Sequence, residues 1–373
     1  MKFKVSSSSL LANLQILSRV IGAKNSMVIL ESILFDLQGN ELTMVASDGE
    51  TSIRTTMQVE GEGDGKVASP AKRLLDTLKE FAEQPLVFEI NDQNFAFEIK
   101  SDTGTYSFVG INGLEYPQVL PEVEAQHAFS ISADELQRMI GNTIFCTVED
   151  QLRPVMGGIF FDITEENLTA VATDAHRLVR IVNSSAHTEE PVSFILPRKP
   201  ASLLRQILQK EEGDVQVSFN DKNARFEMGN SLVICRQLDG RYPNYKQVIP
   251  QSNNNRIIVD RLSILNASRR VQVFANQSTG LIKLDISENK IHLSAQDIDF
   301  STSAEETIVC NYQGEPIRIG FKAPFLTEIL GVLESDEVIF ALADSSRAGL
   351  ILPMENKENE DILVLLMPML IND

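Results

Sequence analysis

One small group of residues in this chain has the types that nucleophilic catalysis needs. Cys146, Asp174 and His176 would supply a nucleophile, an orienting acid and a base if they met in the fold. However, Asp174 ends a short Ala-x-Asp segment whose other copies end at Asp48 and Asp297, and neither copy has a histidine two residues later. An acid present in all three copies is more simply explained as a turn or cap residue. The sequence therefore predicts no catalytic residue and a protein that is not an enzyme.

The other chemistry-bearing residues predict neither a metal site nor a cofactor site. The three cysteines, Cys146, Cys235 and Cys310, are far apart and lack the spacing of zinc sites or disulfide frameworks. None of the four histidines forms a metal-binding pair, and no phosphate-binding loop, GxSxG motif or nuclease-type carboxylate cluster is present. The N-terminal segment lacks the apolar core of a signal peptide, and no stretch approaches the roughly 18 apolar residues of a membrane span. We therefore expect a cytoplasmic protein without metal, cofactor or membrane partner.

Three copies of a repeat of about 125 residues organise the chain. The alternating segment 42–48 matches 168–174, and 291–297 is a weaker third copy, so that the terminal Asp residues are 126 and then 123 residues apart. Tyr116-Pro117 recurs as Tyr242-Pro243 with the same period. The repeat predicts three domains with turn-rich connections between them. Their expected limits are 1–122, 127–250 and 256–373.

Each repeat has the pattern strand, helix, several strands, helix, several strands. Ser6 to Ser9 are expected to cap the first helix, and Ser132 with Glu135 forms a capping box before another. Two helices packed on an antiparallel sheet make an α+β domain. The six expected helical segments are 6–24, 70–82, 133–145, 198–210, 260–272 and 322–333.

The net charge of −19 argues at first against a nucleic-acid partner, but the charges are unevenly distributed. The expected helices contain 14 basic and 6 acidic residues, whereas the rest of the chain contains 19 basic and 46 acidic residues. Lys and Arg also serve as ordinary solvent-facing helix residues, yet acids should then be equally frequent there. The imbalance favours a basic helix face that holds a polyanion through salt-sensitive phosphate contacts.

Three segments, together with the threefold repeat, resemble one known family. Residues 172–178, Ala-Thr-Asp-Ala-His-Arg-Leu, are similar to the Ala-Thr-Asp-Gly-His-Arg-Leu segment of bacterial DNA polymerase III beta subunits, the DNA sliding clamps. Residues 240–250 resemble that family's Gly-Arg-Phe-Pro-Asp-Tyr segment, and Met367-Pro368-Met369 resembles its terminal Met-Pro-Met. The resemblance covers the whole chain. It implies a non-catalytic processivity factor for DNA replication, in which two chains join head to tail into a ring around double-stranded DNA without reading its sequence.

The resemblance also assigns residues to three interfaces. The positions that match DNA-facing basic residues are Lys24, Lys72, Arg73, Arg153, Arg198 and Lys199. The positions that match the apolar core of the homodimer interface are Phe108, Val273 and Phe274.

A cleft between the second and third domains is expected to bind short peptides, typically a Gln followed by apolar and aromatic residues. The implied partners are the DNA polymerase III alpha subunit, the clamp loader, and other polymerases or repair proteins. The matching positions are Met156, Thr173, Ala175, His176, Arg177, Leu178, Pro243, Val248, Phe325, Leu365, Met367, Pro368 and Met369.

The sequence departs from the family pattern at several positions near this cleft. Ala175 replaces the family's usual Gly, Gln247 replaces a basic residue, and 370–373 runs two residues longer than the usual ending. The sequence leaves two other functions open: a three-domain scaffold for another ligand, and a processive DNA enzyme such as a nuclease. The low aromatic content of 6% and the absence of Trp disfavour a polysaccharide-binding scaffold.

Overall fold

The computed structural model describes residues 1–22, 27–119 and 124–371. The chain forms two compact units, one made of residues 1–136 and 202–237 and the other of residues 137–201 and 238–373. These units divide the second repeat between them, because in each unit one sheet continues from one repeat into the next. The three domain limits expected from the repeat therefore stay a prediction.

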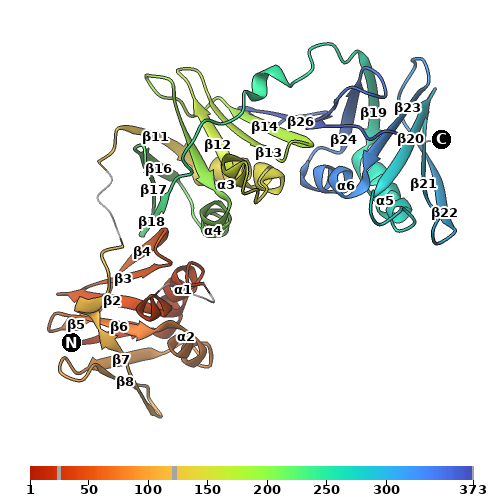
Figure 1. The fold of residues 1–373 in the computed structure, drawn as a ribbon. Helices are drawn as coiled ribbons and strands as arrows, with labels where there is room; N and C mark the ends of the chain where they lie inside the picture. Colours follow the sequence, from red (N-terminus) through yellow and green to blue (C-terminus); the bar gives the residue numbers. More distant parts are fainter. Residues whose placement is uncertain (23–26, 120–123, 372–373) are drawn as a thin grey trace. The chain divides into compact units, whose positions relative to one another are not determined.

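The first unit contains two antiparallel sheets (Figure 1). One has the order β5-β1-β7-β8-β9, with bounds Glu60–Glu62, Lys2–Ser6, Pro85–Ile90, Ala96–Lys100 and Thr105–Val109. The other has the order β10-β6-β2-β3-β4-β18-β17-β16-β11, with bounds Ile111–Asn112, Gly65–Pro70, Ser32–Gln38, Glu41–Ser47, Thr51–Gln58, Ser231–Arg236, Asn223–Met228, Asp214–Phe219 and His127–Ser132. The β4–β18 pairing joins the first repeat to the second.

The second unit is built in the same way. Its larger sheet has the order β15-β12-β13-β14-β26-β25-β24-β19, with bounds Val192–Pro197, Gly158–Ile163, Leu168–Thr173, Arg177–Asn183, Glu360–Leu366, Gly349–Pro353, Glu337–Leu342 and Asn255–Asp260. Its smaller sheet has the order β22-β21-β20-β23, with bounds Thr302–Val309, Lys290–Asp297, Leu281–Ser287 and Ile317–Lys322. The β14–β26 pairing joins the second repeat to the third.

All six predicted helices are present among the described residues, somewhat shorter than expected. They are α1 (Ser7–Leu17), α2 (Ala71–Lys79), α3 (Ala133–Thr143), α4 (Arg198–Leu208), α5 (Arg261–Gln272) and α6 (Ala323–Val332). The predicted caps are confirmed: the Ser6 hydroxyl accepts the Ser9 amide at 3.1 Å, and the Ser132 hydroxyl accepts the Glu135 amide at 3.2 Å. The α+β fold expected from the sequence is therefore confirmed. Among the described residues, no helix is long and apolar enough to cross a membrane.

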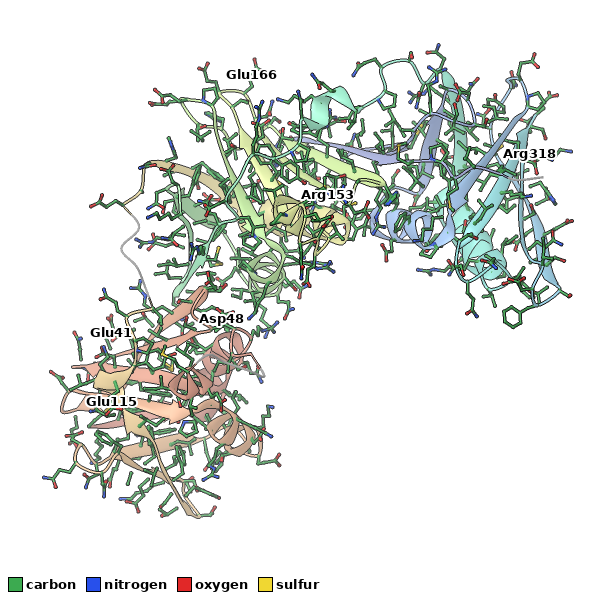
Figure 2. All side chains as sticks on the ribbon, in the orientation of Figure 1. Glu41, Asp48, Glu115, Arg153, Glu166 and Arg318 are labelled. Atoms are coloured by element: carbon green, nitrogen blue, oxygen red, sulfur yellow. The ribbon has the colours of Figure 1, made fainter. Side chains whose placement is uncertain are left out.

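The three Ala-x-Asp segments end in the turn caps that the repeat predicted. Asp48 accepts the amide of Thr51 at 2.7 Å, Asp174 accepts that of Arg177 at 2.9 Å, and Asp297 accepts that of Phe300 at 3.2 Å. Asp48 lies at the turn after β3 (Figure 2). These carboxylates are occupied in holding turns, so the recurrent acid has a structural role.

Candidate partner and nucleic-acid interfaces

The junction between the second and third repeats contains a buried apolar cluster built from both repeats. Strands β14 and β26 pair over seven residues, from Arg177 opposite Leu366 to Asn183 opposite Glu360. Leu178 and Leu365 face each other in this register, and both are buried. They belong to a cluster, called here the junction cluster, that consists of Val171, Leu178, Ile195, Tyr242, Tyr245, Ala341, Leu350, Leu363 and Leu365.

The segment between β18 and β19 packs against this cluster and supplies its two tyrosines. The Tyr242 ring stacks on Phe160 at 4.8 Å between ring centres, and its hydroxyl donates to the Val171 carbonyl. The Tyr245 hydroxyl donates to Asp162 at 2.8 Å, and burial together with this carboxylate raises the pKa of Tyr245. The tyrosines thus fix the segment that carries Pro243 and Val248, both of which remain exposed.

Arg177 links the two repeats at one end of the cluster. Its guanidinium donates to Asp174 at 3.0 Å, to the Phe145 carbonyl at 3.0 Å, and to Glu328 on α6 at 2.5 Å. Burial alone would lower the pKa of this group, but the Glu328 and Asp174 carboxylates help to keep it raised. A buried guanidinium is stable only when its donors are paired, and this one is paired on both sides of the junction.

Phe325 on α6 is held between cations beside the exposed His176. The Arg177 guanidinium carbon lies 4.2 Å from the Phe325 ring centre, and the Lys322 amino nitrogen lies 4.7 Å from it. The His176 ring lies 6.2 Å from the Phe325 ring. Cation–π contacts of this kind fix the orientation of an aromatic side chain that would otherwise rotate.

The segment after β26 closes this region. The Met367 amide donates to the His176 carbonyl at 2.9 Å, and the Met369 amide donates to the Gly320 carbonyl at 2.8 Å. Of the residues predicted to form the cleft, five are buried, namely Met156, Thr173, Arg177, Leu178 and Leu365. Eight keep accessible surface, namely Ala175, His176, Pro243, Val248, Phe325, Met367, Pro368 and Met369.

Direct contacts connect most, but not all, of these predicted residues. They link Ala175 and Thr173 to the Arg177 turn, and Phe325 and Met367 to His176. Met156, Pro243 and Val248 lie on segments beside the junction cluster. Sequence reasoning missed Glu328 and Lys322, for which the chain offers no local signal. It also left Tyr242 out of the site, although that residue recurs in the repeat as Tyr116.

A separate cavity lies beside the segment between β18 and β19. It has a volume of about 650 Å³ and is lined by Asp162, Arg180, Tyr245 and Lys246 among others. None of the predicted cleft residues lines it. The predicted cleft is therefore distinct from this charged hollow.

Cys146 is poorly suited to be a nucleophile. Its side chain is fully buried, and burial raises the pKa of its thiol. Asp174 is occupied by backbone amides and Arg177. Within the described residues, no group of three or more His, Cys, Asp or Glu side chains is arranged to hold a metal ion.

The predicted DNA-facing residues are exposed wherever the structure describes them. Lys72 and Arg73 lie in the first turn of α2, and Arg198 and Lys199 lie in the first turn of α4, at repeat-equivalent positions 126 residues later. A helix N-terminus carries a partial positive charge, which repels basic side chains and attracts phosphates. Placing two cations at both helix starts therefore favours an anionic partner.

The two other predicted DNA-facing residues are Arg153 and Lys24. Arg153 is exposed, and its guanidinium pairs with Asp150 at 2.8 Å. Lys24 lies outside the described residues.

The predicted dimer residues differ in exposure. Val273 and Phe274, at the end of α5, are 76% and 40% exposed. Phe108 is only 7% exposed and stacks on Phe97 at 4.9 Å between ring centres. In the single chain, Phe108 thus belongs mainly to the core of the first repeat, while its neighbour Val109 is 64% exposed on the edge strand β9.

Comparison with known proteins matches the chain along nearly its whole length. Sequence models of the N-terminal, central and C-terminal domains of the DNA polymerase III beta subunit match residues 1–121, 130–244 and 246–370. The chain belongs to the DNA polymerase III beta subunit family. The expectation of a DNA sliding clamp, drawn above from sequence motifs, therefore holds for this chain.

The individual relatives that match this chain are also sliding clamps. A beta sliding clamp of Pseudomonas aeruginosa is 25% identical over 371 residues, which cover 99% of this chain and 100% of the relative. One from Synechococcus elongatus is 28% identical over 364 residues, covering 95% and 96%. The solved sliding clamp of Bartonella birtlesii, bound to griselimycin, is 27% identical with a TM-score of 0.91 over 100% of both chains. The three-domain clamp fold is thus confirmed.

Proposed function

We propose that two copies of this chain join head to tail into a ring that encloses double-stranded DNA and carries DNA-processing enzymes along it. The chain itself supplies no catalytic group, and it acts in the cytoplasm, where it meets DNA. The observation that best supports this proposal is the threefold repeat, in which strand pairing at β4–β18 and β14–β26 joins successive copies and leaves β9 and β22 as sheet edges for the next.

The DNA-facing surface is assigned to Lys72, Arg73, Arg153, Arg198 and Lys199, with Lys24. Changing Lys72, Arg73, Arg198 and Lys199 to Glu should reduce loading onto DNA while leaving the dimer intact. Each lost phosphate contact should lower the slope of log affinity against log salt by roughly 0.9. The decisive assay is retention on nicked circular DNA after loading, followed by loss on linearisation. Unchanged loading of the fourfold variant would place the DNA elsewhere.

The dimer interface is assigned to the exposed end of α5 together with the edge strands β9 and β22. The β21–β22 turn lies beside Val273 and Phe274. The Asn276 side chain donates a hydrogen bond to Asp297, and this bond joins the end of α5 to that turn. That turn exposes Ile298 and Phe300, so four large apolar side chains share one corner. Contiguous apolar patches on a soluble protein generally mark association sites.

Phe274→Asp is the test of this interface. It would bury an unpaired charge on association, a change that typically disfavours binding by several kcal/mol. Light scattering coupled to gel filtration should give a mass near 41.5 kDa for the variant and twice that for the unaltered chain. A variant that remained a dimer would move the interface away from α5.

The partner site is assigned to the junction between the second and third repeats. Its supports are the paired Leu178 and Leu365, the exposed Val248 and Met367, and the oriented Phe325. Methionine and leucine form an adaptable surface that accepts different apolar side chains. Expected partners are the DNA polymerase III alpha subunit, the clamp loader, and other polymerases or repair proteins, each through a short peptide bound at about −8 kcal/mol, or micromolar affinity. Deleting residues 367–373 should abolish this binding and spare the dimer.

A further inference from the structure

The segment from Met367 to Ile371 forms a strap across the third repeat. The Met367 amide donates a hydrogen bond to the carbonyl of His176, just before β14. The Met369 amide donates one to the carbonyl of Gly320 in β23. Met369 and Gly320 form an isolated antiparallel bridge. A backbone hydrogen bond therefore holds each end of the stretch Met367 to Met369, which is the part of the strap assigned to the cleft.

The second fixed point depends on a glycine. A Cβ atom at Gly320 would lie 3.0 Å from the Met369 carbonyl oxygen, 3.1 Å from Ile371 Cγ1 and 2.7 Å from Leu281 Cδ1. The strap thus lies directly on the bare β23 backbone, with Ile371 and Leu281 packed over it. Leu370, by contrast, is 86% exposed. Neighbouring residues of the strap consequently have opposite environments.

We propose that Ile371 is a positioning residue for the partner cleft: by packing on Gly320 it fixes the strap and so holds Met367 to Met369 in place for a bound peptide. This proposal rests on the assignment of the cleft made above. A segment with few backbone bonds opens locally at low free energy, and a partner must then order it on binding. The apolar contact of Ile371 is what keeps the Met369–Gly320 bond formed before a partner arrives.

The test compares two adjacent substitutions in the full-length chain. A fluorescently labelled Gln-Leu-x-Leu-Phe peptide is titrated into the unaltered protein, Ile371→Ser and Leu370→Ser, with anisotropy as the readout. We expect Ile371→Ser to bind roughly tenfold more weakly, Leu370→Ser to bind as the unaltered chain does, and Ile371→Leu to restore binding. Gly320→Ala, which displaces the strap from the other side, should weaken binding to a similar extent.

A second readout separates positioning from general stability. Hydrogen exchange at the Met369 amide should accelerate in Ile371→Ser and not in Leu370→Ser, while dimer mass and thermal unfolding temperature stay unchanged. Full-strength binding by Ile371→Ser would overturn the proposal while leaving the cleft intact, whatever the effect of Gly320→Ala. Failure of the unaltered chain to bind any such peptide would instead overturn the cleft assignment, and this proposal with it.

Discussion

The two junctions between repeats have the same backbone arrangement and different side chains. At the first junction β4 pairs with β18, and at the second β14 pairs with β26, both antiparallel. Thr51 and Ser52 begin the pairing at the first junction, and Arg177 and Leu178, 126 residues later, begin it at the second. The first junction therefore has two small polar residues at the positions where the second has Arg177, which links the two repeats through ion pairs, and the buried apolar Leu178.

Other equivalent residues did not diverge. Tyr116 and Tyr242 are both buried, and each hydroxyl donates to a backbone carbonyl at 3.4 Å. The tyrosine therefore belongs to the architecture of a repeat, whereas Arg177 and Leu178 belong to one junction. This difference shows that a binding site can be added to one copy of a repeated fold by changing a few side chains.

The largest effect on stability should come from removing the cationic link. Arg177→Ala leaves Asp174 without its ion pair in a buried setting, and breaking such a pair destabilises by about 3–5 kcal/mol. Urea unfolding should show this loss, and peptide binding should fall because Phe325 loses the closer of its two cations and keeps only Lys322.

Thr51→Ala, at the equivalent position, is the matched control for this change. It removes one small side chain, and its effect should be near 1 kcal/mol, the centre of single-substitution effects. Equal destabilisation by the two variants would show that the junctions do not differ in the way described.

A smaller effect is expected at the third-repeat side of the link. Glu328 is about half exposed, so solvent screens its ion pair with Arg177. Glu328→Ala should lower the free energy of unfolding by about 1 kcal/mol and weaken peptide binding several-fold. The effect is small because Arg177 keeps its hydrogen bonds to Asp174 and the Phe145 carbonyl. Isothermal titration with the peptide checks this, and a loss as large as that of Arg177→Ala would mean that Glu328 alone fixes the arginine.

The smallest effect concerns the turns that precede the two junctions. Gly49 follows Asp48 with φ of 95°, and Ala175 follows Asp174 with φ of 74°. This region of backbone conformation strains any residue with a Cβ by roughly 1–2 kcal/mol, part of which is offset by the greater unfolded-state freedom of glycine. Ala175→Gly should raise the free energy of unfolding by about 0.5–1 kcal/mol, and Gly49→Ala should lower it by about as much. Opposite signs in thermal unfolding support this, and a destabilising Ala175→Gly contradicts it.

Local patterns in the sequence predict most of the helices, caps and turns of the fold. The six helices, the caps at Ser6 and Ser132, and the structural role of Asp48, Asp174 and Asp297 depend on residues within a few positions of each other. The threefold repeat then predicted three domains with the same pattern of strands and helices. These features depend on spacing and periodicity, which a sequence displays directly.

The details of the interfaces depend on partners that are distant in the chain. Arg177 was assigned to the cleft, but the pairing that makes it a link involves Glu328, 151 positions away. Phe108 was assigned to the dimer interface, and its burial follows from stacking on Phe97 in the adjacent strand β8. A residue type predicts what a side chain can do, whereas its neighbours decide how much of it remains available.

One peptide titration tests directly whether the second junction alone carries the partner site. Leu178→Ser and Leu34→Ser each remove a buried leucine, one from the junction cluster and one from the equivalent face of the first repeat, and both should destabilise by about 2–5 kcal/mol. We predict that Leu178→Ser, still folded and dimeric, binds a labelled Gln-Leu-x-Leu-Phe peptide at least tenfold more weakly, while Leu34→Ser binds it at full strength. Full-strength binding by Leu178→Ser, or an equal loss in both variants, would contradict the account.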